Sequence, residues 1–310
     1  MCRSGGMMRV TNSVPKPRIS RRSSRAIFNR TRRAASSASS TMTFPPQSKA
    51  RTRTLQPFGR GDRMKGRGLE SALMGRTFVV ALGGSTLRPE AQEDRARWFG
   101  RLRQVVLSME GEGRRLGLVV GGGAPAREGI ALASTVLSDR SALDEVGIAA
   151  TRLNATVLQQ VLMDVGLDVA SEVPTSIGAA ASLLDAHHVV VMGGTVPGHT
   201  TDAVAVELAR AAGASTCIIA TNVDRVYDTD PRSNEDAQSF SQMTIDELAA
   251  ITGIDEALAP GASSVVDPIA VGHAKRGAID LVVLDGRDLA RLEAALEGKA
   301  FDGTLIRSNR

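Results

Sequence analysis

Short apolar runs alternate with longer amphipathic stretches over most of this chain. Five runs are rich in β-branched residues and are followed by glycine or polar turn residues, which is typical of buried strands. These runs cover 77–82, 116–120, 188–192, 216–220 and 280–284. Strands that alternate with helices predict an α/β fold with a parallel or mostly parallel sheet, covered by helices on both faces. Ligands of such sheets bind beyond the carboxyl ends of the strands.

The stretches between these runs have helical spacing or helix-capping residues. Expected helices cover about 89–109, 124 onward, 144 to beyond 162, about 202–213, and 288–296. Thr244 and Glu247 have the spacing of a capping box, and Asp267 precedes a proline that suits a helix start. The pattern also predicts an edge strand in a hairpin at 303–306.

Three of the predicted strands run into glycine-rich loops that lead to helices. The loops are Gly83-Gly84-Ser85, Gly121-Gly122-Gly123 and the segment MGGTVPGHTTDAV at 192–204. Backbone N–H groups in such loops, and at the helix N-termini after them, attract phosphate groups. Each loop alone is also explained as an ordinary strand-to-helix turn, because none matches GxxxxGK[ST] or GxGxxG. Together the loops predict one crevice that holds several phosphates.

Polar residues beside the loops extend this predicted site. Thr200, Thr201 or Asp202 is expected to cap the helix that follows the third loop. Arg127 stands four residues after the triple glycine, so it either reaches back to an anion or lies on the solvated surface. Asp144 either caps its helix or hydrogen-bonds a hydroxyl-rich ligand.

The segment TNVDRVYDTDPR at 221–232 follows the fourth strand and contains the chain's single tyrosine, Tyr227. A polar loop at a strand exit suits a contact with adenine or ribose. An Asx-turn loop without a ligand is the alternative.

Charge divides the chain into two unlike parts. Residues 1–73 contain 17 Lys and Arg against 2 Asp and Glu, whereas residues 74–310 contain 21 against 31. The Arg- and Ser-rich tail at 1–73 has too little apolar content to fold. It is interpreted as a segment that precedes the true start near Met74, as a transit peptide, or as an arm that binds nucleic acid or an acidic partner. The acidic remainder argues against nucleic-acid binding by the folded domain.

The remaining composition indicates a cytoplasmic protein. Cys2 and Cys217 show no pairing pattern, which fits a reducing compartment. No apolar run approaches the ~18 residues of a membrane span.

A site of this kind suits phosphoryl transfer from ATP to a phosphorylated acceptor. A phosphate monoester has a second pKa of about 6, so it is a nucleophile at neutral pH without a general base. The protein must instead align two polyanions and offset their repulsion with N–H dipoles, a cationic side chain and Mg²⁺. Arg127 is the catalytic candidate for the cation. Asp202 and Asp267 would orient the loops or help to hold hydrated Mg²⁺, and no direct metal ligands are assigned.

At these residues the chain resembles the amino-acid-kinase superfamily and, within it, the archaeal-type UMP kinases. The resemblance covers about 77–306 and rests on LGGS at 82–85, VGGGAPARE at 120–128, GIAATRLNA at 147–155, VMGGTVPGHTTDAVA at 191–205, ATNVDRVYDTDP at 220–231 and GASSVVDPIA at 261–270. It implies a three-layer α/β/α sandwich around a mainly parallel mixed sheet. It also implies ATP with Mg²⁺ as donor, UMP as acceptor, an acceptor-binding N-terminal half, an ATP-binding C-terminal half, and usually a homohexamer.

The resemblance further implies residue roles. The ATP-binding set is Gly84, Ser85, Gly123, Arg127, Thr221, Tyr227 and Asp230. The UMP-binding set is Gly122, Asp144, Thr195, Val196, Pro197, Gly198, His199, Thr200 and Thr201.

Two positions depart from the family pattern. Ala81 stands where many members have a lysine, and Arg225 replaces a usual glycine. A left-handed backbone at Arg225 would cost about 1 kcal/mol or more, unless the arginine instead adds a phosphate contact. The alternatives are a sister kinase acting on isopentenyl phosphate, carbamate or an amino-acid carboxylate, and a non-catalytic nucleotide-binding storage or regulatory protein.

Overall fold

The structure is a computed structural model that describes residues 77–89, 91–231, 233–256 and 264–309. The chain divides into two units, 1–59 and 60–310, and every described residue belongs to the second. The predictions for the tail at 1–73 and for a start near Met74 lie outside the described residues.

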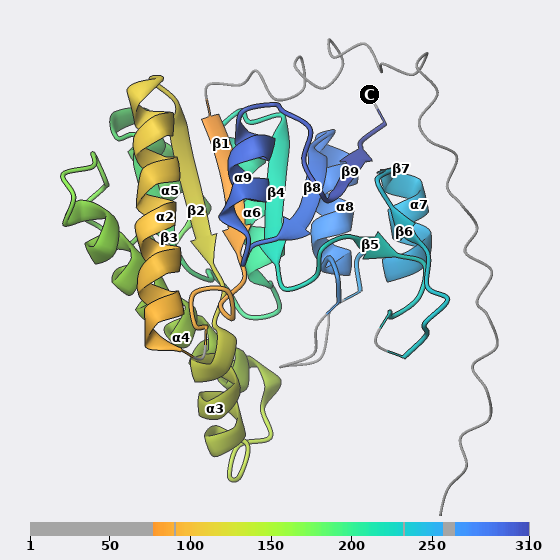
Figure 1. The fold of residues 1–310 in the computed structure, drawn as a ribbon. Coiled ribbons are helices and arrows are strands. Elements are labelled where there is room, and N and C mark those ends of the chain that lie inside the picture. The colour runs from red at the N-terminus through yellow and green to blue at the C-terminus, as the bar shows by residue number, and fades with distance from the viewer. Residues whose placement is uncertain (1–76, 90, 232, 257–263, 310) are drawn as a thin grey trace, which may run out of the picture. The chain divides into compact units, whose positions relative to one another are not determined.

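A seven-stranded sheet forms the centre of the described unit, in the order β3-β2-β1-β4-β8-β9-β7 (Figure 1). Its strands are β1 (Thr77–Leu82), β2 (Arg115–Val120), β3 (Val189–Met192), β4 (Thr216–Thr221), β7 (Gln242–Thr244), β8 (Asp280–Asp285) and β9 (Thr304–Arg307). All neighbouring pairs are parallel except β8 with β9. The predicted mainly parallel mixed sheet is therefore confirmed.

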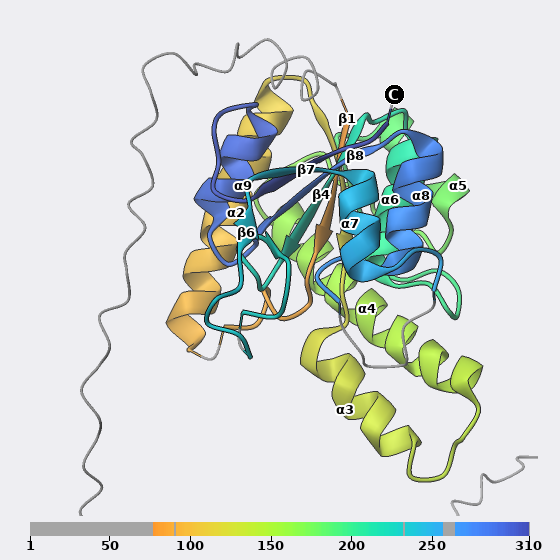
Figure 2. The same ribbon diagram turned by 90° about the vertical axis from the view of Figure 1, so that its right-hand side faces the viewer.

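Helices cover both faces of the sheet, as the alternation predicts. They are α2 (Gln92–Gly111), α3 (Gly123–Ala133), α4 (Arg140–Met163), α5 (Ile177–Ala186), α6 (Thr201–Ala211), α7 (Ile245–Thr252), α8 (Pro268–Gly277) and α9 (Leu289–Leu296). Helices α2, α4 and α9 pack with the inward side chains of one face, and α5, α6, α7 and α8 pack on the other (Figure 2). Alternate residues of β1 serve the two cores: Phe78, Val80 and Leu82 face the first, and Val79 and Ala81 the second.

The strand ends are level, and this places the predicted loops on one edge. Leu82 pairs with Val120 on one side and with Ala220 on the other. Because these strands are parallel, the loops after β1, β2, β3 and β4 all leave the same edge of the sheet, near α3 and α4 (Figure 1). The prediction that the glycine loops open on one side of the molecule is confirmed.

Three of the predicted helix caps agree with the structure. Thr200 caps α6, Thr244 and Glu247 form the capping box of α7, and Asp267 caps α8 before Pro268. Asp144 is not a cap, because α4 begins four residues earlier and Asp139 caps it.

Other local predictions were wrong or incomplete. The segment 303–306 was expected to be an edge strand in a hairpin, but β9 lies between β8 and β7 inside the sheet. Its neighbour β7 is a three-residue strand, and a second small sheet pairs β5 (Val226–Tyr227) with β6 (Ser239–Phe240). Helix α5 was also not predicted. These elements are short, so periodicity gives little signal for them.

The loops after β1 and β2 contact each other through backbone atoms alone. A Cβ atom on Gly84 would stand 2.3 Å from the Gly123 nitrogen and 2.4 Å from the Gly121 oxygen. Gly123 also has a φ of +60°, which favours glycine. These glycines are therefore required for the two loops to approach.

We expect Gly84→Ala to lower the free energy of unfolding by at least about 2 kcal/mol, because backbone atoms would have to shift to admit the methyl group. Gly100→Ala is the matched control. Gly100 lies in α2 with no atom within 4 Å of its added Cβ, so this change should stabilise the helix by about 0.5–1 kcal/mol. Urea denaturation of the two variants measures both effects, and equal midpoints would contradict the close approach.

Candidate functional site

Asn154 on α4 holds the first two glycine loops together. Its side-chain amide donates to the carbonyl oxygens of Gly121 at 2.8 Å and Gly122 at 3.0 Å. Its amide oxygen accepts a hydrogen bond from Arg88, which follows the first loop, at 2.7 Å. Asn154 is only 1% exposed, and removing such a buried partner leaves carbonyl groups unsatisfied. One buried amide thus ties the loops after β1 and β2 to α4.

Thr151, one turn earlier on α4, holds the third loop. Its hydroxyl accepts the Gly194 N–H at 2.7 Å. A Cβ on Gly193 would lie 2.5 Å from the same hydroxyl oxygen. Arg152 donates to the carbonyl oxygens of Gly194 and Thr195, each at 3.3 Å. Gly193 therefore lies directly against the backbone of α4.

Asp144 shapes the segment 194–201, which we call the acceptor loop. One Asp144 carboxylate oxygen accepts the Gly198 N–H at 2.8 Å. Gly198 has a φ of +84°, so glycine suits this turn. Val196 is 49% exposed. The acceptor loop thus keeps an exposed outer side while α4 holds its backbone.

Asp267 connects the acceptor loop to the second half of the domain. Its carboxylate accepts a hydrogen bond from the Thr200 hydroxyl and also caps α8 through the Ile269 N–H at 3.1 Å. Asp267 is 2% exposed. Burial, and secondly the negative charge of Asp267, raise the pKa of Asp202 to about 7. Two predicted site carboxyls therefore lie close together at the start of α6.

A histidine pair lies behind the acceptor loop. The rings of His199 and His273 meet edge to face with centroids 5.8 Å apart, and His273 contacts Glu207 at 3.1 Å. Burial lowers the pKa of His273. The Nδ1 atom of His199 is buried, and within the described part of the chain it has no hydrogen-bond partner.

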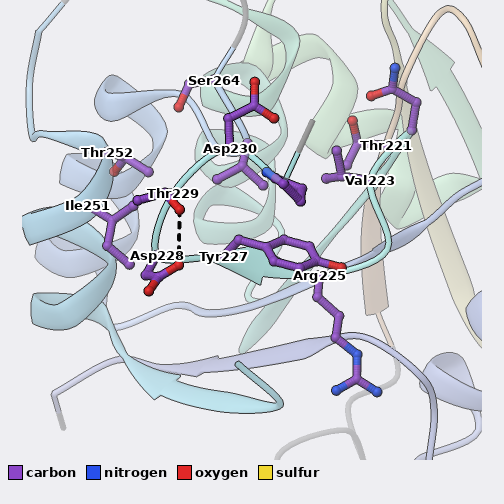
Figure 3. Close-up of a pocket in the computed structure, with 13 residues that line it drawn as sticks. Thr221, Val223, Arg225, Tyr227, Asp228, Thr229, Asp230, Ile251, Thr252 and Ser264 are labelled. Carbon is purple, nitrogen blue, oxygen red and sulfur yellow. Dashed lines mark hydrogen bonds between the residues drawn. The ribbon is translucent and has the colours of Figure 1, made fainter. Parts of the chain in front are cut away.

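A cavity of about 350 Å³ lies beside the β4–β5 connection (Figure 3). Thr221, Tyr227 and Asp230, the residues predicted to hold adenosine, all line it. We call this cavity the donor pocket; its other lining residues are Asn222, Val223, Arg225, Asp228, Thr229, Pro231, Ile251, Thr252, Ser264 and Val265. The Tyr227 hydroxyl donates to Asp224 at 3.0 Å, and desolvation raises the pKa of that phenol.

Arg225 does not have the strained backbone considered for it. Among described residues other than glycine, positive φ occurs at Asp255 and Ala278. The Arg225 guanidinium pairs with Asp302 and points away from the labelled side chains around the pocket (Figure 3). The Arg225 guanidinium therefore binds the carboxylate of Asp302, whereas the sequence had suggested a phosphate as its partner.

Arg127 and Ser85, two predicted phosphate contacts, do not line the donor pocket. Arg127 is exposed on α3, beyond the second glycine loop. Ser85 is exposed and lines a separate cavity with Trp98 and Arg287. Gly84 and Gly123, in contrast, lie in the contact between the first two loops.

The domain's two lysines do not replace the lysine missing at Ala81. Lys275 pairs with Asp246 at 2.8 Å, and Lys299 pairs with Glu297 at 2.7 Å. Lys275 lies in the last turn of α8, and Lys299 follows the carboxyl end of α9. Both helices begin at the glycine-loop edge of the sheet. They therefore lie toward the opposite edge of the sheet.

Within 77–309, apart from the undescribed gaps, no three or more His, Cys, Asp or Glu side chains are grouped to hold a metal ion. None of the described helices has the length and hydropathy needed to span a membrane.

Sequence reasoning gave no role to Thr151, Arg152 or Asn154, although they stand in a motif that carries the family resemblance. Polar residues three apart on the inner face of an otherwise apolar helix are the signal that identifies Thr151 and Asn154. No comparable signal marks Asp302, because its partner lies 77 residues away.

Comparison with known proteins agrees with this architecture. Residues 76–285 match the model of the amino acid kinase family. A uridylate kinase from Methanococcus vannielii is 40% identical over 231 residues, which are 74% of this chain and 98% of that protein. A uridylate kinase from Methanospirillum hungatei is 41% identical, over 75% of this chain and 95% of that protein.

Solved structures show the same fold. Uridylate kinase from Archaeoglobus fulgidus superposes with a TM-score of 0.63 and 35% identity, over 74% of this chain and 99% of that one. UMP kinase from Bacillus anthracis has a TM-score of 0.61 at 20% identity, over 76% and 97% of the two chains, and this likeness concerns the fold alone. With the family model matched over most of the described unit, the chain belongs to the amino acid kinase family.

Proposed function

We propose that this chain is a UMP kinase, which transfers the γ-phosphoryl group of ATP to UMP in pyrimidine nucleotide biosynthesis. A phosphate oxygen of UMP attacks the γ-phosphorus in line, the bond from that phosphorus to the β–γ bridging oxygen breaks, and UDP and ADP are formed. The observation that carries the proposal is the hydrogen bond from Thr200 to Asp267. It joins the acceptor loop to the segment that contributes Ser264 and Val265 to the donor pocket.

In this proposal the first half of the domain binds UMP. The acceptor loop wraps the UMP phosphate through Thr195, Val196, Pro197, Gly198, His199, Thr200 and Thr201. Gly122 contacts the nucleotide, and the carboxylate oxygen of Asp144 that does not hold Gly198 receives a ribose hydroxyl. The hydrogen bonds between α4 side chains and this loop support the assignment, because they fix the loop's backbone before the substrate binds.

The second half binds ATP. Thr221, Tyr227 and Asp230 hold adenosine in the donor pocket. The phosphates extend toward Gly84, Ser85, Gly123 and Arg127 at the neighbouring strand ends. The parallel order of β2, β1 and β4 supports this path, because it sets the three strand ends side by side.

Charge compensation is the main catalytic demand on this site. Mg²⁺ bound with ATP would supply positive charge to the phosphate oxygens. The Asp202 and Asp267 pair suits this cation, because burial and the negative charge of Asp267 raise the pKa of Asp202, and a cation beside both carboxyls would offset these effects. Arg127 supplies the side-chain cation, and backbone N–H groups at the starts of α3 and α6 supply fixed dipoles.

An acceptor screen with the full chain tests the function. Radiolabelled ATP is incubated with UMP, CMP, dUMP, isopentenyl phosphate, carbamate or an amino acid, and the labelled products are separated. We expect UDP as the preferred product. Preferred labelling of a non-nucleotide acceptor would identify a sister kinase, and ATP binding without transfer would identify a non-catalytic relative.

We expect Arg127→Ala to lower kcat/KM for UDP formation more than tenfold, because a cation at the transferred phosphate is worth at least about 1.4 kcal/mol. Arg115→Ala is the control, since Arg115 begins β2 at the opposite edge of the sheet. Steady-state kinetics measure both variants. A loss below tenfold for Arg127→Ala would remove Arg127 from the mechanism.

The raised pKa of Asp202 predicts a pH-dependent stability. Between its unfolded value of 3.8 and its folded value of about 7, the folded state binds more protons than the unfolded state. The stability contributed by protonated Asp202 is therefore present below about pH 4 and is lost as the pH rises through 7. We therefore compare the free energy of unfolding of Asp202→Asn with that of the wild type at two pH values. The difference in favour of the variant should be about 2 kcal/mol larger at pH 8 than at pH 5. Urea denaturation at both pH values measures this difference, and equal gains would contradict the raised pKa.

We also propose that the chain acts in the cytoplasm as a homo-oligomer, with a homohexamer expected. The outer side of α4 exposes apolar side chains, with Leu153 55% and Val157 41% exposed, and such a stripe suits self-association. Light scattering of the purified full chain measures its oligomeric state, and a monomer at micromolar concentration would contradict the proposal.

A further inference from the structure

The wall of the donor pocket is a weak structure by itself. Tyr227, Asp228, Thr229 and Asp230 project from a connection that includes the hairpin of β5 and β6. That hairpin pairs only two residues from each strand, Val226 with Phe240 and Tyr227 with Ser239. Two-stranded hairpins of this size are marginally stable in water. Contacts from elsewhere must therefore hold the pocket wall in place.

Thr304, the first residue of β9, holds both strands of this hairpin. Its hydroxyl accepts the Val226 N–H at 2.9 Å and donates to the Phe240 carbonyl oxygen. Val226 and Phe240 are the residues that face each other across the hairpin. Thr304 is 0% exposed and pairs with Val283 of β8 inside the main sheet. The buried Thr304 hydroxyl thus anchors the small sheet to the large one, next to the bond from the Leu305 N–H to the Ser241 carbonyl oxygen at 3.0 Å.

Asp302, two residues earlier, holds the start of the same connection. It accepts hydrogen bonds from Nε and Nη2 of Arg225, the former at 3.0 Å. Its other oxygen pairs with Nη2 of Arg291 from α9 at 2.8 Å. Asp302 therefore fixes the residue just before β5 against both α9 and the approach to β9.

We propose that Asp302 and Thr304, which we call the latch, are positioning residues for the donor nucleotide. The inference rests on the proposed function only in taking the donor pocket as the adenosine site. Neither latch residue lines the pocket. The latch acts through the hairpin, by keeping Tyr227 and Asp230 at the cavity before the nucleotide binds.

The latch acts on one substrate. Asp144, Thr151 and Arg152 hold the acceptor loop from α4, and these contacts are separate from those of Asp302 and Thr304. Loosening the latch therefore raises KM for ATP and leaves KM for UMP and kcat nearly unchanged. A general loss of structure would change all three quantities.

Two variants loosen the latch, and each has a control. Thr304→Val removes both hydroxyl bonds at nearly constant volume, and we expect KM for ATP to rise about tenfold. Thr304→Ser keeps the hydroxyl, and its KM for ATP should stay within threefold of the wild-type value. Asp302→Ala removes the pair to Arg225 and should raise KM for ATP about threefold, as expected for a partly exposed ion pair. Arg103→Gln removes a comparable ion pair to Asp164, between α2 and the end of α4. This variant should leave KM for ATP unchanged.

Two measurements that do not depend on turnover accompany the kinetics: calorimetric titration of ADP, and hydrogen exchange of peptides from residues 222–240. The proposal predicts faster exchange in these peptides and weaker ADP binding for Thr304→Val and Asp302→Ala, but not for their controls. Faster exchange with unchanged ADP affinity would overturn the latch, as would an equal rise in KM for UMP. If the wild type forms no UDP, but ADP binds more weakly to the latch variants than to the wild type, the proposed function fails and the latch stands. If the wild type binds no ADP, both fail.

Discussion

The closest contact in the site is between two stretches of backbone. Gly84 meets Gly121 and Gly123 at distances that admit no side chain, and the buried amide of Asn154 fixes the second stretch. This contact brings the ends of β1 and β2 together at one edge of the sheet. The third loop joins them through Thr151 on the same helix. The arrangement of the three glycine loops therefore depends on glycines and on one helix face.

The two halves of the domain are joined by carboxylates as well as by the sheet. Asp267 binds the acceptor loop and caps α8, while the burial of Asp202 and, secondly, the charge of Asp267 raise the pKa of Asp202 to about 7. On the donor side Asp302 binds Arg225 and Arg291. Lysines have no part in these contacts. In the proposed reaction, backbone dipoles, arginine and a Mg²⁺ ion bound with ATP would offset the charge of the two nucleotides.

Much of the fold could be predicted from the sequence, because buried parallel strands give continuous apolar runs and glycine ends them. Motifs selected Thr221, Tyr227 and Asp230, which line the donor pocket, and the residues of the acceptor loop. Long-range contacts could not be predicted in this way. Asn154, Asp302 and Thr304 act on partners distant in the sequence, and the inner position of β9 depends on its pairing with β7. The contact of Gly193 with α4 is also a long-range one that only the coordinates show.

The central claim is that both nucleotides bind in one continuous site at a single edge of the sheet. A compound in which adenosine and uridine are joined by five phosphates tests this claim most directly, by calorimetric titration against ATP and UMP alone. The account predicts one compound per chain, an affinity at least about 100-fold higher than that of either nucleotide, and loss of binding by both nucleotides once it is bound. Affinity no higher than that of ATP, or UMP binding that persists beside the compound, would contradict the account.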